Sequence, residues 1–390
     1  MSKVLIVVSA FWGIGGISTS VINMCHELVQ QDNDVHFLNM GDADRGLLEK
    51  LPNEVKVLEL KGFAQNWNLS REKMKAESGI VKGYKYIIGA IKKLTNKNEL
   101  WLRIVFKNAQ MKEDYDLAVA FMPCAPTYYF LIHCVNTKKK VGFVHGELKH
   151  LGDISSWDRY FEKMNFIACV SNAVRDEFRK KYATISEKFI TVYNMFDAQN
   201  IEEMSKLECK SNFDKHLINI ATISRIENST KRIDRIPQIC KILIEKGVRK
   251  FHWYIIGGGE DEDADKRLAV ELHVDAYIDF VGIQKNPYPY IFGCDFTVLT
   301  SLTESFGMAV LESQILQTPV ISTKYPAVYE IIENQVSGII ADQNIKDIAD
   351  KVETLIRDET LRNRIRKNLS QQRYSNQLPY SQLMGVLDHE

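Results

Sequence analysis

The 390-residue sequence lacks the features that mark several large classes of protein. It contains no Cys-x-x-Cys pair, and its seven cysteines show no regular spacing, so neither a zinc site nor a disulfide framework is predicted. No apolar run approaches the length of a membrane-spanning helix, and Lys3–Val8 is too short for a secretion signal. Fifty basic and 50 acidic residues cancel, which removes any overall attraction to nucleic acid. We therefore expect a cytoplasmic protein that does not bind nucleic acid.

The sequence instead alternates short apolar runs with helical patterns. The runs predict strands over 4–8, 35–38, 55–60, 117–121, 140–144, 166–170, 189–192, 217–223, 251–256, 278–281, 296–299, 320–322 and 338–341. Such runs, separated by helices, predict parallel sheets covered on both faces. A polar segment, 197–216, separates the two halves. We expect α/β architecture with two doubly wound domains, 1–196 and 217–370, joined by this linker and facing a central cleft, toward which strand ends would present ligand-binding residues.

Two glutamates in the second half flank the start of a predicted helix. Glu304 precedes an apolar helical run, Met308–Leu316, and Glu312 lies within it, while Pro319 ends the pattern. Ser305 is the predicted N-cap, and Gly307 would let a ligand approach the backbone. The free N–H groups at a helix start attract anions. An amphipathic helix with two solvated glutamates is the alternative explanation.

The loop after the first strand carries Gly13, Gly15 and Gly16 and opens a helix that is predicted to end near Val29. Glycine allows a ligand close to the backbone there. The third glycine of a dinucleotide fingerprint is replaced by Ser18, and no acidic residue ends the second strand, which argues against a nicotinamide or flavin site. A tight turn without a ligand remains possible.

A polar loop after the strand 217–223 carries Arg225 and Lys231. Cations of this kind would stabilise a departing pyrophosphate, although solvated loop charges would have the same pattern. The next strand ends in the glycine turn Gly257–Gly259, which is consistent with close packing of a nucleotide.

The order of these motifs resembles a known family. It comprises the Gly-Gly-Ile loop at 15–17, His145 after a strand, Ser224-Arg225-Ile226 with Lys231, the glycine turn with Glu260 and Asp261, 279–282 (DFVG), 304–312 (ESFGMAVLE) and 326–332 (PAVYEII). The sequence is similar, over residues 3–357, to retaining nucleotide-sugar glycosyltransferases of family 4, which have the GT-B fold of two Rossmann-like domains. The most specific part is Glu-x7-Glu followed by Thr-Pro-Val-Ile-Ser at 318–322.

The resemblance implies transfer of a hexosyl or N-acetylhexosaminyl unit from a nucleoside diphosphate sugar, UDP being preferred, with retention of configuration and without a metal or other cofactor. The implied acceptor is a glycan or a lipid-linked molecule in cell-surface polysaccharide synthesis. The resemblance also implies that residues 371–390 pack back on the N-terminal domain, which would be the acceptor side, while the C-terminal domain would bind the donor.

Carried over position by position, the resemblance gives roles to residues of this chain. Glu304 would hold hydroxyls of the donor sugar, Glu312 the ribose, and Arg225 and Lys231 the diphosphate. The remaining implied donor contacts are Gly15, Gly16, Gly257, Val281, Ile283, Phe306, Gly307, Met308 and Ala309. The family usually has alanine and glycine where Ser313 and Thr318 stand here, but both are helix-packing positions and put little in doubt.

His145 ends the strand 140–144, where a histidine is by default a polar cap on the sheet. The family pattern makes it instead a hydrogen-bond partner of the donor sugar near the reacting carbon. The implied catalytic residues are thus His145, Arg225, Lys231 and Glu304. Glu147 has thin motif support as an acceptor contact. We assign no general base, because the leaving phosphate can itself take the acceptor proton on the same face.

Two Asp-x-Asp sequences, at 42–44 and 263–265, match the metal motif of another transferase fold. Both are expected in acidic loops away from the glutamate segment, with nothing to converge their oxygens on a cation. We therefore expect no metal site.

The segment 61–112 carries twelve basic residues against three acidic ones, with Tyr84, Tyr86, Trp101 and Phe106 interleaved. A basic amphipathic helix with aromatics can lie on an anionic membrane surface, which would place the protein at the inner face of the membrane. The alternative is a solvated outer helix whose aromatics lie in the core.

Three functions remain in competition at this point. The first is the glycosyltransferase. The second is a GT-B epimerase or phosphorylase, for which acid/base carboxylates or a pyridoxal lysine could not be placed. The third is a non-catalytic GT-B subunit that binds a partner or a glycan, which would be expected to lose the donor-site charges that this chain keeps.

Overall fold

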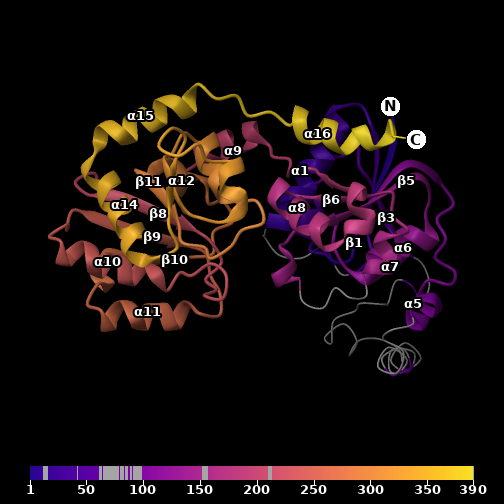
Figure 1. Ribbon diagram of the computed structural model, residues 1–390, viewed down its shortest axis with the longest axis horizontal. Coiled ribbons are helices and arrows are strands. Elements are labelled where there is room, and N and C mark those ends of the chain that lie inside the picture. The colour runs from indigo at the N-terminus through magenta and orange to yellow at the C-terminus, as the bar shows by residue number, and fades with distance from the viewer. Residues whose placement is uncertain are drawn as a thin grey trace. The chain divides into compact units, whose positions relative to one another are not determined.

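A computed structural model describes residues 1–11, 16–41, 43–60, 99–151, 157–209 and 213–389, and the single positions 64, 79, 83, 87 and 90. The chain forms two compact units (Figure 1). Unit 1 comprises Met1–Phe196 and Asn376–Glu390, and unit 2 comprises Asp197–Ser375.

Unit 1 is built on a parallel sheet with the strand order β3-β2-β1-β4-β5-β6-β7. Its strands are β1 (Lys3–Val8), β2 (Asp34–Asn39), β3 (Lys56–Glu59), β4 (Asp114–Ala120), β5 (Asn136–Val144), β6 (Phe166–Cys169) and β7 (Phe189–Thr191). Its helices are α1 (Gly16–Gln30), α2 (Arg45–Leu48), α5 (Leu100–Val105), α6 (Ala125–Cys134), α7 (Asp158–Phe161), α8 (Asn172–Lys181) and α16 (Gln377–Met384), with 3-10 turns η2 (Leu148–His150), η3 (Ala183–Lys188) and η6 (Gly385–Leu387).

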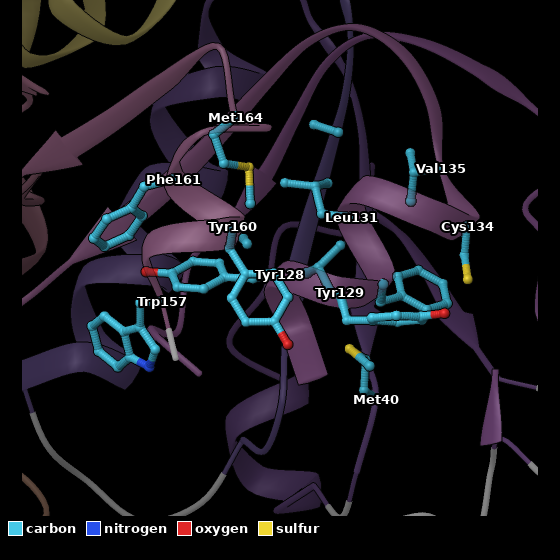
Figure 2. Packing of buried hydrophobic residues seen from close by; sticks show 14 of the residues in the cluster. Met40, Tyr128, Tyr129, Leu131, Cys134, Val135, Trp157, Tyr160, Phe161 and Met164 are labelled. Carbon is cyan, nitrogen blue, oxygen red and sulfur yellow. The ribbon is translucent and has the colours of Figure 1, made fainter. Parts of the chain in front are cut away.

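An aromatic cluster lies in the hydrophobic core of unit 1 (Figure 2). Tyr128 of α6 lies among Trp157, Tyr160 and Phe161, with ring centroids 5.8–6.0 Å away. Its hydroxyl donates a 2.8 Å hydrogen bond to the carbonyl of Phe143, near the end of β5. This core therefore fixes the end of β5, and the candidate residue His145 follows directly after it.

Unit 2 repeats the architecture with the strand order β10-β9-β8-β11-β12-β13. Its strands are β8 (Ile218–Ile223), β9 (Phe251–Ile256), β10 (Ile278–Gly282), β11 (Phe296–Leu299), β12 (Val320–Thr323) and β13 (Ile339–Ala341). Its helices are α9 (Ala198–Ser205), α10 (Arg235–Glu245), α11 (Glu262–Glu271), α12 (Tyr288–Gly293), α13 (Met308–Ile315), α14 (Ile345–Arg357) and α15 (Glu359–Ser370), with 3-10 turns η4 (Asp275–Tyr277) and η5 (Pro326–Glu330).

These sheets confirm the predicted fold class of two doubly wound α/β units, and every predicted strand segment forms a strand. Buried β-branched residues made the strands legible, since parallel strands that are covered on both faces read as continuous apolar runs. Strands β4 and β5 begin earlier than predicted, because their first residues are polar and charged.

The segment expected to be a linker contains helix α9 and belongs to unit 2. Asp197 caps this helix by accepting a 3.0 Å hydrogen bond from the N–H of Asn200, and Ile201 is buried. The helix is mostly polar because it buries only a narrow face, which concealed it in the sequence.

The chain returns to unit 1 at its C-terminal end (Figure 1). The side-chain amide of Asn376 donates to the Glu27 carboxylate at 2.9 Å and to the Phe196 carbonyl at 2.6 Å. Asn33 donates to the Tyr380 hydroxyl at 3.1 Å, and Leu383 is buried. The last helix, α16, is thus an integral part of unit 1.

Each sheet has a point at which the chain reverses the direction of strand addition. In unit 1 this point lies between β1 and β4, and in unit 2 between β8 and β11. The loops that leave the carboxyl ends of such strands diverge to opposite faces of the sheet and leave a crevice, where doubly wound folds bind ligands. In unit 2 these two loops carry Lys231 and Glu304.

Candidate functional site

The loops after β8 and β11 meet through an ion pair between Lys231 and Glu304. The Lys231 ammonium Nζ donates to Glu304 Oε1 at 2.6 Å, with the two side chains only 18% and 15% exposed. Ser301 Oγ donates to the same carboxylate oxygen at 2.7 Å. Two residues that the sequence singled out separately therefore form one cluster at the reversal point of the sheet.

The other Glu304 oxygen, Oε2, has no hydrogen-bond partner within the described part of unit 2. The ammonium of Lys231 has three N–H donors, and it uses one of them to bind this carboxylate. The cluster thus keeps an acceptor on Glu304 and donors on Lys231, which is the combination required by a ligand with both hydroxyls and anionic oxygens.

A buried arginine and a glutamine support the Glu304 loop from below. Arg235, only 4% exposed, donates through one terminal nitrogen to the Thr300 carbonyl at 2.8 Å and to the side-chain oxygen of Gln343 at 2.9 Å. The Gln343 amide in turn donates to the carbonyls of Ser301, Leu302 and Lys324 at 3.2, 3.3 and 2.7 Å. This network holds the Glu304 loop in one conformation. The sequence analysis missed both residues, because nothing in their local pattern marks them.

Helix α13 begins one residue after Gly307, which is its N-cap. The prediction that Ser305 caps this helix is therefore wrong. Gly307 has a left-handed φ of +102°, and a Cβ there would come within 2.2 Å of the Tyr325 hydroxyl. Left-handed backbone and lack of space together require glycine. The group that comes close to Gly307 in the structure is thus the Tyr325 hydroxyl, and the close approach of a ligand to Gly307 stays a prediction.

The first N–H groups of α13 belong to Met308 and Ala309, both partly exposed. Amides at the first positions of a helix have no carbonyl in a preceding turn to bond, and the helix dipole makes this end favourable for anions. Phe306, just before the helix, has a buried side chain. The predicted donor contacts Phe306, Gly307, Met308 and Ala309 thus lie on the same loop and helix start as Glu304.

Glu312 lies in the second turn of α13 against Tyr288 of α12. Burial raises the pKa of the Glu312 carboxyl to about 7, and a hydrogen bond from the Tyr288 hydroxyl opposes that rise. The pKa of Tyr288 is raised by burial and by the nearby carboxylates of Glu312 and Asp197. Glu312 therefore titrates near neutral pH. Tyr288, like Arg235 and Gln343, was not predicted from the sequence.

Arg225 is mostly exposed, at 71%, and its guanidinium lies 3.1 Å from the carboxylate of Glu227. Glu227 also accepts hydrogen bonds from Ser229 and Thr230, which with Arg225 lower the pKa of its carboxyl. The N–H of Lys231 donates to the Glu227 carbonyl at 2.9 Å. Arg225 and Lys231 thus belong to one ordered loop, although they make separate ion pairs.

The glycine turn after β9 packs against this same loop. A Cβ at Gly257 would lie 1.8 Å from the Ser224 carbonyl oxygen, and one at Gly259 would lie 2.1 Å from the Ile226 carbonyl oxygen. The chain itself therefore accounts for these glycines. Val281 is partly buried, whereas Ile283, after β10, is 74% exposed. Contacts of Gly257, Val281 and Ile283 with a nucleotide stay predictions.

His145 follows β5 in unit 1 and lies against the rings of Phe121 and Phe143. Its Nε2 is 2.7 Å from the carbonyl oxygen of Phe121, and because a carbonyl only accepts, Nε2 must carry the proton. Burial lowers the pKa of His145 to about 4, against the opposing effect of this bond. The ring is thus neutral near pH 7, and Nδ1 is an acceptor.

Gly15, Gly16 and Glu147 are further predicted site residues, and all three belong to unit 1. Gly16 begins α1 with open space around its Cβ position, while Gly15 lies outside the described residues. Glu147 is buried and pairs with Lys149 at 2.8 Å. No ligand contact of these residues is tested by their positions, so their predicted contacts stay predictions.

The two Asp-x-Asp motifs do not both lie in loops as expected. Asp44 caps α2, and Asp42 lies outside the described residues. Asp263 and Asp265 lie in the first turn of α11, where Asp265 is buried. Among the residues that the structure describes, no group of three or more His, Cys, Asp or Glu side chains could hold a metal ion.

Most of the basic segment 61–112 falls outside the described residues. Within the part that is described, Trp101 and Phe106 are buried in the core of unit 1, with Phe106 stacked on Tyr129, while Arg103, Lys107 and Lys112 are exposed. For these two aromatics the alternative of core packing is correct. Over the described ranges, no helix is both long and apolar enough to cross a membrane.

Comparison with known proteins matches the two halves of the chain to two family models. Residues 14–200 match Glycosyltransferase Family 4, and residues 204–372 match Glycosyl transferases group 1.

Curated relatives are distant in sequence. The poly(ribitol-phosphate) alpha-N-acetylglucosaminyltransferase of Staphylococcus aureus is 24% identical over 338 residues, which are 85% of this chain and 64% of that protein. The N-acetyl-alpha-D-glucosaminyl L-malate synthase of Bacillus anthracis is 25% identical over 207 residues, 51% of this chain and 52% of that protein. The chain thus spans less than two thirds of the length of these relatives.

Solved structures resemble the whole chain. A variant of TarM from S. aureus, in complex with fondaparinux, alpha-GlcNAc-glycerol and UDP, has a TM-score of 0.73 at 16% identity, with full coverage of both chains. HepE from Anabaena, in complex with UDP and glucose, has a TM-score of 0.69 at 17% identity, again with full coverage of both chains. With two family models that cover both units, these full-length similarities show that the chain belongs to the GT-B glycosyltransferases.

Proposed function

We propose that this protein transfers a hexosyl or N-acetylhexosaminyl unit from a nucleoside diphosphate sugar, preferably a UDP-sugar, to a glycan or lipid-linked acceptor in cell-surface polysaccharide synthesis. The observation that carries the proposal is the Lys231–Glu304 pair at the reversal point of the unit 2 sheet, beside the start of α13. Relatives named for poly(ribitol-phosphate) glycosylation, capsular polysaccharide and lipopolysaccharide core biosynthesis, and a structural neighbour with bound UDP, support the substrate class.

In the proposed reaction the bond between the anomeric carbon and the leaving phosphate oxygen breaks, and the acceptor hydroxyl oxygen bonds to the same carbon. We propose retention, with the acceptor proton passing to the leaving phosphate oxygen. Negative charge then builds on the diphosphate. Lys231, Arg225 and the N–H groups that open α13 would stabilise that charge, because preorganised donors act most strongly where charge develops.

The other site residues would recognise the donor. Glu304 Oε2 would accept hydrogen bonds from sugar hydroxyls while Oε1 stays with Lys231 and Ser301. Glu312 would accept the ribose hydroxyls. His145, neutral and with Nδ1 as acceptor, would receive a hydroxyl of the donor sugar rather than stabilise an anion. In this scheme no step needs a metal ion or another cofactor.

The test is a transfer assay on the purified full-length chain. Thermal unfolding with UDP, GDP, ADP and their sugars first identifies the donor, because a ligand that binds only the folded state raises the melting temperature. Glu304→Ala and Arg225→Ala should each lower transfer by about two orders of magnitude, as loss of transition-state contacts does, with the melting temperature of the free protein little changed. Proton NMR of the product's anomeric centre then tests retention. Near-normal turnover in both variants would refute the assignment of the site.

A further inference from the structure

The side chain of Asn228 links the loop that carries Arg225 and Lys231 to other parts of unit 2. The Asn228 amide Nδ2 donates to Asp265 Oδ1 of α11 at 2.8 Å. Asn228 Oδ1 accepts the N–H of Asp234, just before α10, at 3.0 Å, and the N–H of Asn228 itself donates to Asp261 Oδ2 at 2.6 Å. Asn228 thus joins the middle of the loop, its far end and a neighbouring helix.

These bonds set the path of the chain through Lys231. Residue 232 has a left-handed φ of +53°, unusual for arginine, and its guanidinium makes two bonds to the Asp234 carboxylate at 2.9 and 3.0 Å. A non-glycine residue holds such a conformation only where its surroundings impose it. Because Asp234 is tied to Asn228, this amide helps to set the direction in which Lys231 leaves the loop, together with the 3.1 Å bond from the Thr300 hydroxyl to the Lys231 carbonyl.

Asp265 is an unusual partner for a purely structural bond. It is 1% exposed, and its Oδ2 has no hydrogen-bond partner in the described part of the chain. The charged groups that act on it are the carboxylates of Asp234, from the loop, and Asp261, from the turn before α11. Burial, with these two carboxylates, raises the pKa of Asp265 to about 6, while the bond from Asn228 lowers it.

A buried carboxylate with one unsatisfied oxygen costs stability, and a neutral side chain would serve packing alone at least as well. Ionised, it is also the stronger acceptor for the Asn228 amide. The charge thus strengthens a side-chain connection between α11 and the loop that carries Arg225 and Lys231.

We propose that Asn228 and Asp265 are positioning residues for transfer: the Asp265 carboxylate holds Asn228, and Asn228 holds the loop so that Lys231 and Arg225 meet the donor diphosphate. This inference rests on the proposed function of that loop. It adds that donor binding depends on a buried carboxylate which the donor does not touch.

The first experiment measures donor KM and kcat for Asn228→Ala in the full-length protein. Loss of two side-chain hydrogen bonds should raise the donor KM about tenfold, with kcat changed less than about threefold. Asn334→Ala is the matched control, because its side chain also accepts a backbone N–H, from Ile340 at 2.9 Å, in a turn of unit 2. That variant should keep the wild-type KM.

The second experiment compares the pH dependence of the wild type and Asp265→Asn. As the pH falls from 7 to 5, Asp265 is protonated and its bond from Asn228 weakens, so the wild-type donor KM should rise; the variant should lack this component. A nucleoside diphosphate sugar is the ligand used, since its bridging phosphates stay ionised over this range. Glu312 titrates equally in both proteins, so the ratio of the two profiles isolates Asp265.

Stability should change in the opposite sense. The folded pKa of Asp265 is raised, so its contribution to stability is present below its ordinary pKa and is lost as the pH rises through about 6. The melting temperature of Asp265→Asn, measured relative to that of the wild type, should therefore increase as the pH rises from 5 to 8. If Asp265 served only to stabilise the fold, Asp265→Asn would lose donor binding and stability together.

The outcomes separate the two proposals. If Lys231→Met transfers at the wild-type rate, the proposed role of the loop in the donor site is wrong. If Lys231→Met is impaired but Asn228→Ala keeps a KM within twofold of the wild type, the positioning role is overturned and the proposed function stands. If the donor KM of the wild type and of Asp265→Asn depends on pH in the same way, the proposed role of Asp265 is overturned. This comparison can be made even if Asn228→Ala does not fold.

Discussion

Glu312 should release a proton when the nucleotide binds. Its pKa of about 7 in the free protein is set by burial, against an ordinary value of 4.5. At pH 7 about half of the free molecules would carry the proton. Ribose hydroxyls that donate to the carboxylate would favour its ionised form and lower this pKa, so binding should release up to about half a proton and tighten as the pH rises.

The size of the effect follows from the shift. Each pKa unit corresponds to about 1.4 kcal/mol, so the penalty for ionising Glu312 in the free protein is about 3 kcal/mol. Since burial raises the pKa of Glu312 in the folded protein, the stability that this carboxyl contributes is present below pH 4.5. That contribution is lost as the pH rises through 7. Glu312→Gln should therefore unfold with a weaker dependence on pH between 5 and 8.

Titration calorimetry with a nucleotide sugar, in two buffers of different ionisation enthalpy at pH 7, measures the released proton. The wild type should show the release and Glu312→Gln should not. Glu304→Gln is the comparison variant, because it removes the other carboxylate of the site and leaves Glu312 in place. Equal proton release by the wild type and Glu312→Gln would refute the assignment of the ribose contact to Glu312.

Three further predictions concern the same site. A double-mutant cycle of Lys231→Met and Glu304→Gln on transfer should give a coupling of about 1–3 kcal/mol, since the two charges lie 2.6 Å apart with little exposure; additive losses would contradict a functional pair. Gly307→Ala should lower the free energy of unfolding by about 1–3 kcal/mol in urea denaturation and abolish transfer, whereas Gly385→Ala, at φ −58° with open space, should change neither. Excess EDTA should leave transfer unchanged; complete loss that manganese restores would contradict metal independence.

The sequence was sufficient to predict the sheets because their signal is local. Most strands contain a short apolar run that is buried, and burial on both faces leaves no polar alternation in that run. Helix α9 escaped because its polar residues read as a linker while only Ile201 and Ser205 are buried. The cap of α13 was misplaced because left-handed backbone at Gly307 cannot be seen in residue types alone.

At the site, sequence reasoning named the charged residues but not the contacts among them. Lys231 and Glu304 lie 73 positions apart, and only the order of strands in the sheet brings them together. Asn228, Arg235 and Gln343 went unnoticed because polar residues in loops and at helix starts are common, and their roles appear only in the hydrogen bonds they make across the fold.

The most direct test of the account is the rate of glycosyl transfer by Glu304→Gln, measured with the donor that thermal stabilisation identifies. This change keeps the shape of the side chain but removes the charge that pairs with Lys231. We expect a loss of about two orders of magnitude in kcat/KM with an unchanged fold by circular dichroism. Transfer within a few-fold of the wild type would contradict the claim that the Lys231–Glu304 cluster is the donor site.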